Sequence, residues 1–194
     1  AVVGLGTMAF AMSDVLLEPY GGEILQWSVA STTKLTAVLA FGSLLGLIFG
    51  SYVLGSDRSG NAYATARAAA LLGIPALGLV IVAAPFELDA GFVVANLMLG
   101  FGAALFAHAT LTATMNRATK EQAGLALGAW GAVQATAAGG AMALGAIIRD
   151  TVDWVSGALG QTAFQGIGGY LTVYAIEIVL LLVTVAVLVP LARA

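Results

Sequence analysis

Apolar runs of about 20 residues or more, separated by short polar breaks, constrain this chain more than any other feature, because about 20 mostly apolar residues let a helix cross the hydrocarbon core of a bilayer. Hydrophobic residues make up 60% of the sequence and charged residues only 9%, whereas about a quarter of the residues of a soluble domain are charged. The runs are too long for membrane strands and lack the alternation of a membrane barrel. The sequence therefore predicts an all-α polytopic membrane protein.

Six membrane helices are expected between the polar breaks, because each break interrupts an apolar run that is long enough to span. The predicted helices cover residues 1–19, 29–54, 64–84, 90–115, 123–148 and 168–191. The longest break covers residues 149–166. The chain opens at Ala1 inside an apolar run, with neither an initiator Met nor a basic region, so we expect it to be the interior of a longer protein.

The charged residues divide between two sets of breaks. The first set is basic and comprises Arg58, Arg67, Arg117, Lys120 and Arg193. The second set is mostly acidic and comprises Glu18, Glu23, Lys34, Glu87, Asp89, Arg149, Asp150 and Asp153. Cytoplasmic loops of membrane proteins carry an excess of Lys and Arg, so the first set and both chain ends are predicted to face the cytoplasm. Trp27 and Trp154 fall in the opposite breaks, where interfacial aromatic residues are expected.

An internal repeat groups the six helices as three plus three. LGTMAFAMSD (5–14) aligns within GFGAALFAHAT (100–110), and LAFGSLLG (39–46) aligns with GAWGAVQA (128–135). The first alignment places Gly6 over Gly102 and Phe10 over Phe106. Because three helices reverse the direction of the chain, the two triplets are inverted three-helix repeats, the construction of each six-helix half of major-facilitator transporters.

Four segments carry a resemblance to a known family: SDVLLEPYGGEIL (13–25), ASTTKLTAVLAFGSLLG (30–46), QAGLALGAWGAVQATAAGGAMALG (122–145) and VYAIEIVLLL (173–182). They resemble the C-terminal half of the PucC/LhaA group, the bacteriochlorophyll-delivery branch of the major facilitator superfamily. The resemblance covers nearly the whole chain. It implies that residues 1–194 are the C-terminal six-helix half of a fold of about twelve helices, with the N-terminal half absent.

The resemblance implies an assembly factor for the light-harvesting antenna of purple phototrophic bacteria, in their inner (intracytoplasmic photosynthetic) membrane. The implied partners are light-harvesting antenna polypeptides, the reaction centre, the lipid bilayer and the protein's own N-terminal half, and the implied ligand is bacteriochlorophyll. The alternative is a secondary transporter that moves a small or hydrophobic solute by alternating access. Polar groups at mid-membrane depth are few, which favours a hydrophobic client. The sequence assembles no nucleophile–base pair or metal cluster, so no enzyme is expected, and no basic-aromatic patch indicates a nucleic acid.

Three acidic residues lie close together in a chain with few charges: Asp14, Glu18 and Glu23. Asp14 and Glu18 are four apart and are expected on one helical face, while Pro19 loosens the helix and lets Tyr20 sit at the interface. Glu18 and Glu23 are interpreted as the exit of a span. Asp14 is deeper, where a carboxylate costs a few kcal/mol unless it is paired, so it is expected to face the bundle interior. Its candidate roles are a partner for a pigment carbonyl, a proton-coupling group and a structural tie to the missing half.

His108 is the only histidine. Neutral imidazole is a common metal ligand, so His108 is a candidate axial ligand for the magnesium of a chlorin. A hydrogen bond to a neighbouring helix and a proton relay are the alternatives. Gln134 is likewise a candidate ligand for the magnesium or a hydrogen-bond partner of a neighbouring helix. Trp130 is a candidate surface on which the pigment ring could stack. The candidate pigment site therefore comprises His108, Asp14, Gln134 and Trp130.

Asn96 and Glu177 complete the set of polar residues expected at mid-membrane depth. Glu177 is expected to face protein, with a snorkelled position as the alternative. Glycines recur at three- or four-residue spacing at positions Gly42, Gly46 and Gly50, and again at Gly124, Gly128 and Gly131. Such stripes allow close contact between helices. They are interpreted as bundle packing, with a groove for a flat macrocycle or for a partner helix as the alternative.

Overall fold

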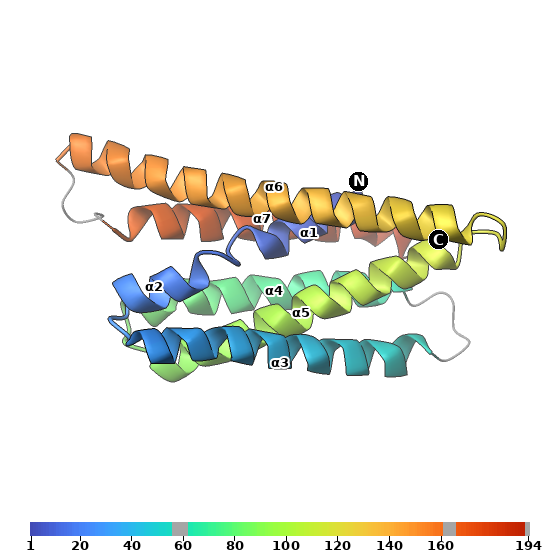
Figure 1. The fold of residues 1–194 in the computed structure, drawn as a ribbon, viewed down its shortest axis with the longest axis horizontal. Helices are drawn as coiled ribbons and strands as arrows, with labels where there is room; N and C mark the ends of the chain where they lie inside the picture. Colours follow the sequence, from blue (N-terminus) through green and yellow to red (C-terminus); the bar gives the residue numbers. More distant parts are fainter. Residues whose placement is uncertain (56–61, 161–165, 193–194) are drawn as a thin grey trace.

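The computed structural model describes residues 1–55, 62–160 and 166–192, and Figure 1 shows their arrangement. The helices are α1 (Val2–Ala11), α2 (Leu17–Glu23), α3 (Val29–Leu54), α4 (Ala62–Ala83), α5 (Asp89–Met115), α6 (Ala123–Ala158) and α7 (Gly168–Leu191). No β-strand occurs among the described residues. Five helices, α3 to α7, are long and apolar enough to cross a membrane. The prediction of an all-α, multi-pass membrane protein is therefore confirmed.

The first predicted helix is wrong as a continuous element, because residues 12–16 separate α1 from α2. Pro19 supplies the physical reason. In a continuous helix its ring would clash with the carbonyl of Val15 and could not donate a hydrogen bond to it. In the observed structure Pro19 is the third residue of α2. The N–H groups of the first turn of a helix have no acceptor within that helix, so a proline there loses no hydrogen bond.

The predicted loop at 149–166 is wrong over residues 149–158, because α6 continues to Ala158. At 1.5 Å per residue, its 36 residues extend about 54 Å, far more than the hydrocarbon core of about 30 Å. The charged residues of this stretch therefore lie on a helix, since charge by itself does not end one. The helix ends just before Gly160, whose φ of +69° is the left-handed conformation that commonly terminates helices.

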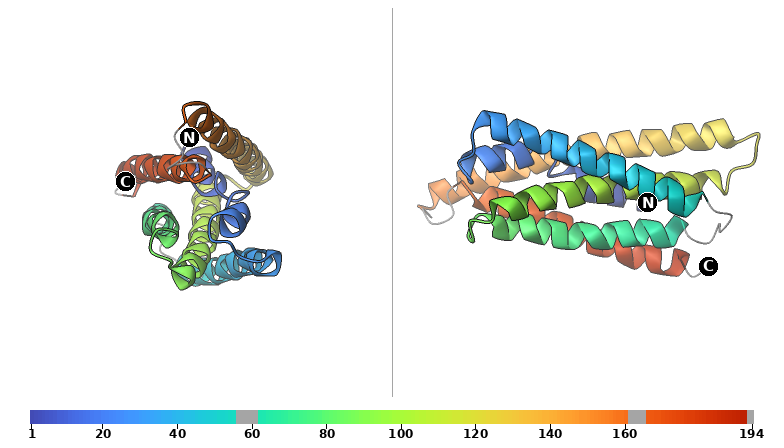
Figure 2. Two further views of the ribbon diagram at one scale, coloured as in Figure 1. Left: turned by 90° about the vertical axis from the view of Figure 1, so that its left-hand side faces the viewer. Right: turned by 90° about the horizontal axis from the view of Figure 1, so that it is seen from below.

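The helices are arranged around a central pair, α1 and α5. In the end view of Figure 2, α4 and α7 lie on one side, α3 and α6 lie apart on the other, and α1 and α5 lie between them. Helix α5 contacts α3 and α4, helix α1 contacts α6 and α7, and α4 contacts α7. In the repeat, α1 (with α2) corresponds to α5, α3 to α6 and α4 to α7. The α3–α5 contact therefore corresponds to the α6–α1 contact, and the α4–α5 contact corresponds to the α7–α1 contact. The packing therefore follows the internal repeat.

Residues that the repeat aligns also contact one another reciprocally. Gly6 of α1 packs on the ring of Phe106 in α5, and Gly102 of α5 packs on the ring of Phe10 in α1. The two aligned rings have centroids 6.0 Å apart. Equivalent positions thus meet at the centre of the bundle, as expected for inverted repeats related by a pseudo-two-fold axis.

The glycine stripe of α3 packs inside the bundle. Gly42 lies against the backbone of Leu97, and Gly46 lies against the backbone of Phe101, one turn further along α5. Gly50 continues the same contact with α5. A side chain at these positions would force the two helices apart, so the interpretation as bundle packing is confirmed for this stripe.

The glycine stripe of α6 has open surroundings instead. A Cβ atom added at Gly124, Gly128 or Gly131 would meet no atom within 4 Å. Over the whole of α6 only Ala141 and Gly145 are buried. Helix α6 therefore presents an unpacked small-residue face, although it aligns with α3 in the repeat.

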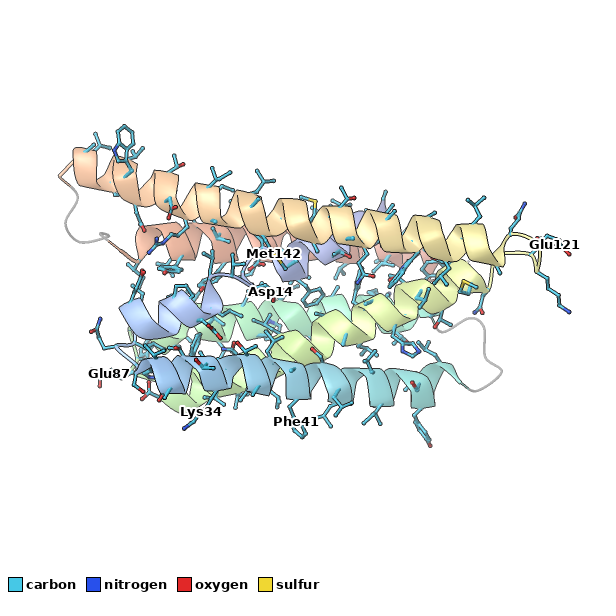
Figure 3. All side chains as sticks on the ribbon, in the orientation of Figure 1. Asp14, Lys34, Phe41, Glu87, Glu121 and Met142 are labelled. Atoms are coloured by element: carbon cyan, nitrogen blue, oxygen red, sulfur yellow. The ribbon has the colours of Figure 1, made fainter. Side chains whose placement is uncertain are left out.

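Charged residues gather at the two ends of the bundle. Figure 3 shows Lys34 and Glu87 at one end and Glu121 at the other. This separation follows the predicted division of the breaks, and the assignment of one end to the cytoplasm stays a prediction. Arg58 and Arg193 lie outside the described residues.

Gly46→Leu is expected to destabilise the fold, whereas the matched change Gly128→Leu should leave it intact. A side chain at position 46 would clash with the backbone of Phe101, and overpacking of this kind typically costs about 1–3 kcal/mol. The surroundings of Gly128 are open. Thermal unfolding of the detergent-purified variants measures the difference. Equal stability of the two variants would contradict the close packing of α3 on α5.

Candidate functional site in the cleft between α3 and α6

A cleft opens on the side of the bundle where α3 and α6 lie apart. Two cavities form it, of about 240 Å³ and about 150 Å³, and both are lined by Asp14. Residues of α2, α3 and α5 line the larger cavity, and residues of α1, α5 and α6 line the smaller one. Asp14 belongs to the break between α1 and α2. The break caused by Pro19 therefore places a carboxylate where the two cavities meet, and we name the whole the Asp14 cleft.

The larger cavity gathers acidic and amide side chains. Asp14 is exposed to it (Figure 3), because outside the helices the residue turns toward the cleft. That this carboxylate faces the interior of the complete bundle stays a prediction. Glu18 lines the same cavity and accepts a hydrogen bond from the hydroxyl of Thr36 on α3. Asp14 and Glu18 thus share a surface despite the break that separates them.

Asn96 of α5 lines the larger cavity and has one unpaired acceptor, which is buried. Its side chain is 1% exposed, and its Nδ2 donates to the carbonyl of Phe92 over 2.9 Å. Its Oδ1 has no hydrogen-bond partner among the described residues. A buried polar atom without a partner costs free energy, so this oxygen lowers the stability of the packed bundle.

The smaller cavity is mainly apolar. The aromatic pair Phe10 and Phe106 lines it, and Gln134 of α6 adds an amide that can donate or accept. Gln134 therefore lies in the same cavity as Asp14, as the predicted pigment site requires.

Two of the predicted site residues line neither cavity. The ring of His108 lies 3.4 Å from the position that a Cβ on Gly50 would take, in the contact between α5 and α3. The indole Nε1 of Trp130 donates to the hydroxyl oxygen of Thr110 over 3.3 Å and ties α6 to α5. The structure brings together Asp14, Glu18, Asn96 and Gln134.

Glu177 of α7 faces protein, as expected, and none of its surface is exposed. Its Oε1 accepts a hydrogen bond of 2.7 Å from the backbone N–H of Ser13, within the break. In a continuous helix this N–H would bond to the carbonyl of Ala9. Glu177 therefore replaces a helical hydrogen bond and holds the chain that carries Asp14. Its Oε2 and the hydroxyl of Tyr174 have no partner in the part of the chain that the structure describes.

Comparison with known families identifies the chain. The family described as PUCC protein matches residues 1–194. The chain belongs to the PucC family. It is similar to Protein PucC of Rhodovulum sulfidophilum, with 53% identity over 151 residues, covering 78% of this chain and 33% of that protein. To Protein PucC of Cereibacter sphaeroides it is 46% identical over 193 residues, covering 99% of this chain and 41% of that protein.

A more distant relative is the Bacteriochlorophyll synthase 44.5 kDa chain of Rhodobacter capsulatus. It is 32% identical over 143 residues, covering 70% of this chain and 32% of that protein. The chain thus spans between 32% and 41% of the length of these three relatives. No solved structure shows significant similarity to the chain.

The Asp14 cleft of this PucC-family chain consists of two small cavities. Each of them encloses less than the about 300–1,000 Å³ of a usual ligand site. No histidine lines either of them, and the searched part of the chain has no group of three His, Cys, Asp or Glu side chains that could hold a metal ion. The donors and apolar rings present can form one wall of a pigment site.

Tyr20 was expected at the membrane interface, and this expectation is wrong. The side chain is fully buried, and its ring lies 5.3 Å from that of Tyr170 and 5.5 Å from that of Phe92, measured between centroids. Its hydroxyl donates to the carbonyl of Val80 over 3.3 Å. The break before α2 turns this short helix so that Tyr20 points into the bundle.

Arg149 organises a polar cluster that the sequence did not indicate. It pairs with Glu23 of α2 and, at 2.9 Å and 3.4 Å, with Asp150 and Asp153 of its own helix. The hydroxyl of Tyr170 donates to Glu23 over 2.8 Å. The cluster ties α2 to α6 and α7. The signal for it was the single arginine in the mostly acidic set.

Glu177→Leu is expected to destabilise the PucC-family chain, whereas Glu177→Gln should be tolerated. Leucine leaves the buried N–H of Ser13 without an acceptor, at a cost of about 1–3 kcal/mol, while glutamine keeps an oxygen in the same place. Thermal unfolding in detergent measures both variants. Val179→Leu, at an exposed position of α7, is the neutral control. A leucine variant as stable as the glutamine variant would show that Glu177 does not hold the break.

Proposed function

We propose that this PucC-family protein is an assembly factor for the light-harvesting antenna and reaction-centre complexes of purple phototrophic bacteria. It binds antenna polypeptides and delivers bacteriochlorophyll to them without turning over a substrate. Family membership supports this proposal, as does similarity to a relative named as a bacteriochlorophyll synthase chain. The proposed location is the intracytoplasmic photosynthetic membrane, with both chain ends cytoplasmic, in line with the basic and acidic sets of breaks.

The proposed architecture is the C-terminal six-helix half of a major-facilitator-like fold. The reciprocal contacts of Gly6 with Phe106 and of Gly102 with Phe10 support an inverted repeat of the kind that builds such a half. The relatives are more than twice as long as the matched region, which leaves room for a second half. In this arrangement the N-terminal half covers the Asp14 cleft and supplies the second wall of a pigment site.

The observation that carries antenna binding is the open glycine face of α6. Gly124, Gly128 and Gly131 meet no atom within 4 Å, while the corresponding stripe of α3 is packed against α5. Without side chains at these positions a transmembrane helix can approach closely and gain van der Waals contact. A single-span antenna polypeptide is such a helix, and an apolar contact of this kind needs no ion pair.

Gly128→Leu is expected to weaken association with antenna polypeptides without lowering the amount of protein. The added side chain blocks close approach, and the loss of about 1.4 kcal/mol corresponds to a tenfold weaker complex. Co-purification of antenna polypeptides with the tagged full-length protein measures the effect. Tyr52→Leu, at an exposed position of α3, is the matched control. Equal co-purification with the Gly128 and Tyr52 variants would exclude the α6 face as the antenna site.

Gln134→Leu is expected to lower the bacteriochlorophyll absorbance of the purified full-length protein per mole of protein. The change removes an amide from the smaller cavity while keeping its bulk, so a hydrogen bond to a pigment carbonyl is lost. His108→Leu tests the prediction of an axial ligand in the same measurement, and retained pigment there would leave His108 a packing residue. A wild-type protein without pigment would overturn the delivery role.

The larger cavity favours a second candidate, a secondary transporter. Its polar groups include the carboxylates of Asp14 and Glu18, which are acceptors unless they are protonated. They suit a solute that carries N–H or O–H groups. Alternating access requires solute movement across sealed vesicles, whereas assembly of antenna complexes does not, so flux measurements separate the two functions.

A further inference from the structure

A groove separate from the Asp14 cleft lies where α3 and α5 begin. A cavity of about 540 Å³ at the start of the two helices adjoins a second of about 450 Å³ further along them, and both are lined by Lys34, Val38 and Val93. Figure 3 shows Lys34 and Phe41 pointing away from the bundle on the same side of α3. We name the two cavities together the Lys34 groove.

Two opposite charges lie at the end of the groove where α3 and α5 begin. Lys34 and Asp89 line the same cavity, yet neither belongs to an ion pair among the described residues. The indole Nε1 of Trp27 donates to Oδ1 of Asp89 over 2.9 Å. This bond orients the carboxylate and leaves Oδ2 without a partner in the described part of the chain.

The rest of the groove is apolar. Phe41, Val94 and Leu97 line it beyond Lys34, and Phe41 and Val94 are 55% and 47% exposed. Phe41 follows Lys34 by seven positions, which is about 10 Å along the helix. A charged head and an apolar trough of this length match the headgroup and the first part of an acyl chain of a phospholipid whose headgroup is level with Trp27, where interfacial aromatic residues sit.

We propose that the Lys34 groove binds a phospholipid whose headgroup carries both a phosphate and a primary ammonium, as phosphatidylethanolamine does. The phosphate pairs with the ammonium of Lys34, the lipid ammonium donates to Asp89, and an acyl chain lies along Phe41 and Val94. Charge complementarity selects this headgroup. An anionic lipid without an amine leaves Asp89 unpaired beside a negative charge, and a choline headgroup has no N–H to donate.

Native mass spectrometry of the full-length protein, titrated with lipids of identical acyl chains, tests the proposal. The probes are phosphatidylethanolamine, phosphatidylcholine and phosphatidylglycerol. We expect phosphatidylethanolamine to be retained preferentially. Lys34→Gln and Asp89→Asn should each reduce its binding about tenfold, because each removes a charge-assisted hydrogen bond. Glu87→Gln, at the same end but outside the lining of both cavities, is the matched control and should change nothing.

Val94→Trp keeps both charges and fills the apolar trough, so it should also reduce binding, independently of the headgroup. Thermal unfolding of each variant identifies any that fails to fold. Equal retention of the three lipids, or retention unchanged in the Lys34 and Asp89 variants, would overturn the proposal in favour of a nonspecific lipid annulus. Preference for phosphatidylglycerol with no effect of Asp89→Asn would overturn it in favour of a purely anionic lipid. Absence of any retained lipid would overturn it as well.

Discussion

One hydrogen bond in the core, from the backbone N–H of Ser13 to the carboxyl group of Glu177, supports most of what is distinctive in this structure. Pro19 interrupts the first helix, and in apolar surroundings a freed backbone group must find an internal partner. Glu177 supplies it from α7. The break then turns Asp14 toward the cleft and directs α2 so that Tyr20 enters the core. A buried acid, which is costly in a membrane helix, thereby positions the candidate site.

The two triplets share a plan but differ in how their second helices are packed. Equivalent glycines and phenylalanines meet at the centre, and this is the contact that makes the bundle symmetric. Around it, α3 is packed tightly on α5 through Gly42 and Gly46, while α6 leaves its glycines open and extends well beyond the length of a membrane span. Symmetry therefore accounts for the scaffold, and the departure from it marks α6 as the helix with an open surface.

The helices and the site differ in how far the sequence predicted them. Helices α3 and α7 begin and end at the predicted residues, because hydropathy over about 20 residues reports directly on burial in a bilayer. Asp14, Asn96 and Gln134 were predicted as polar groups at depth and Glu18 at the exit of a span, and the two cavities bring all four together. His108 and Trp130 were predicted for the same site, yet they lie in contacts between helices, because the choice of neighbour depends on how each helix is rotated.

The sequence by itself determined the class of the protein, the places of the five long apolar helices and the internal repeat, since these follow from composition and order along the chain. Tertiary structure decided which of two similar glycine stripes is packed, which partner Glu177 has and where Arg149 forms its cluster. Those outcomes depend on contacts between residues far apart in the chain, such as Ser13 with Glu177 and Glu23 with Arg149. Local pattern carries no information about such pairs, because either glycine stripe satisfies the same spacing rule.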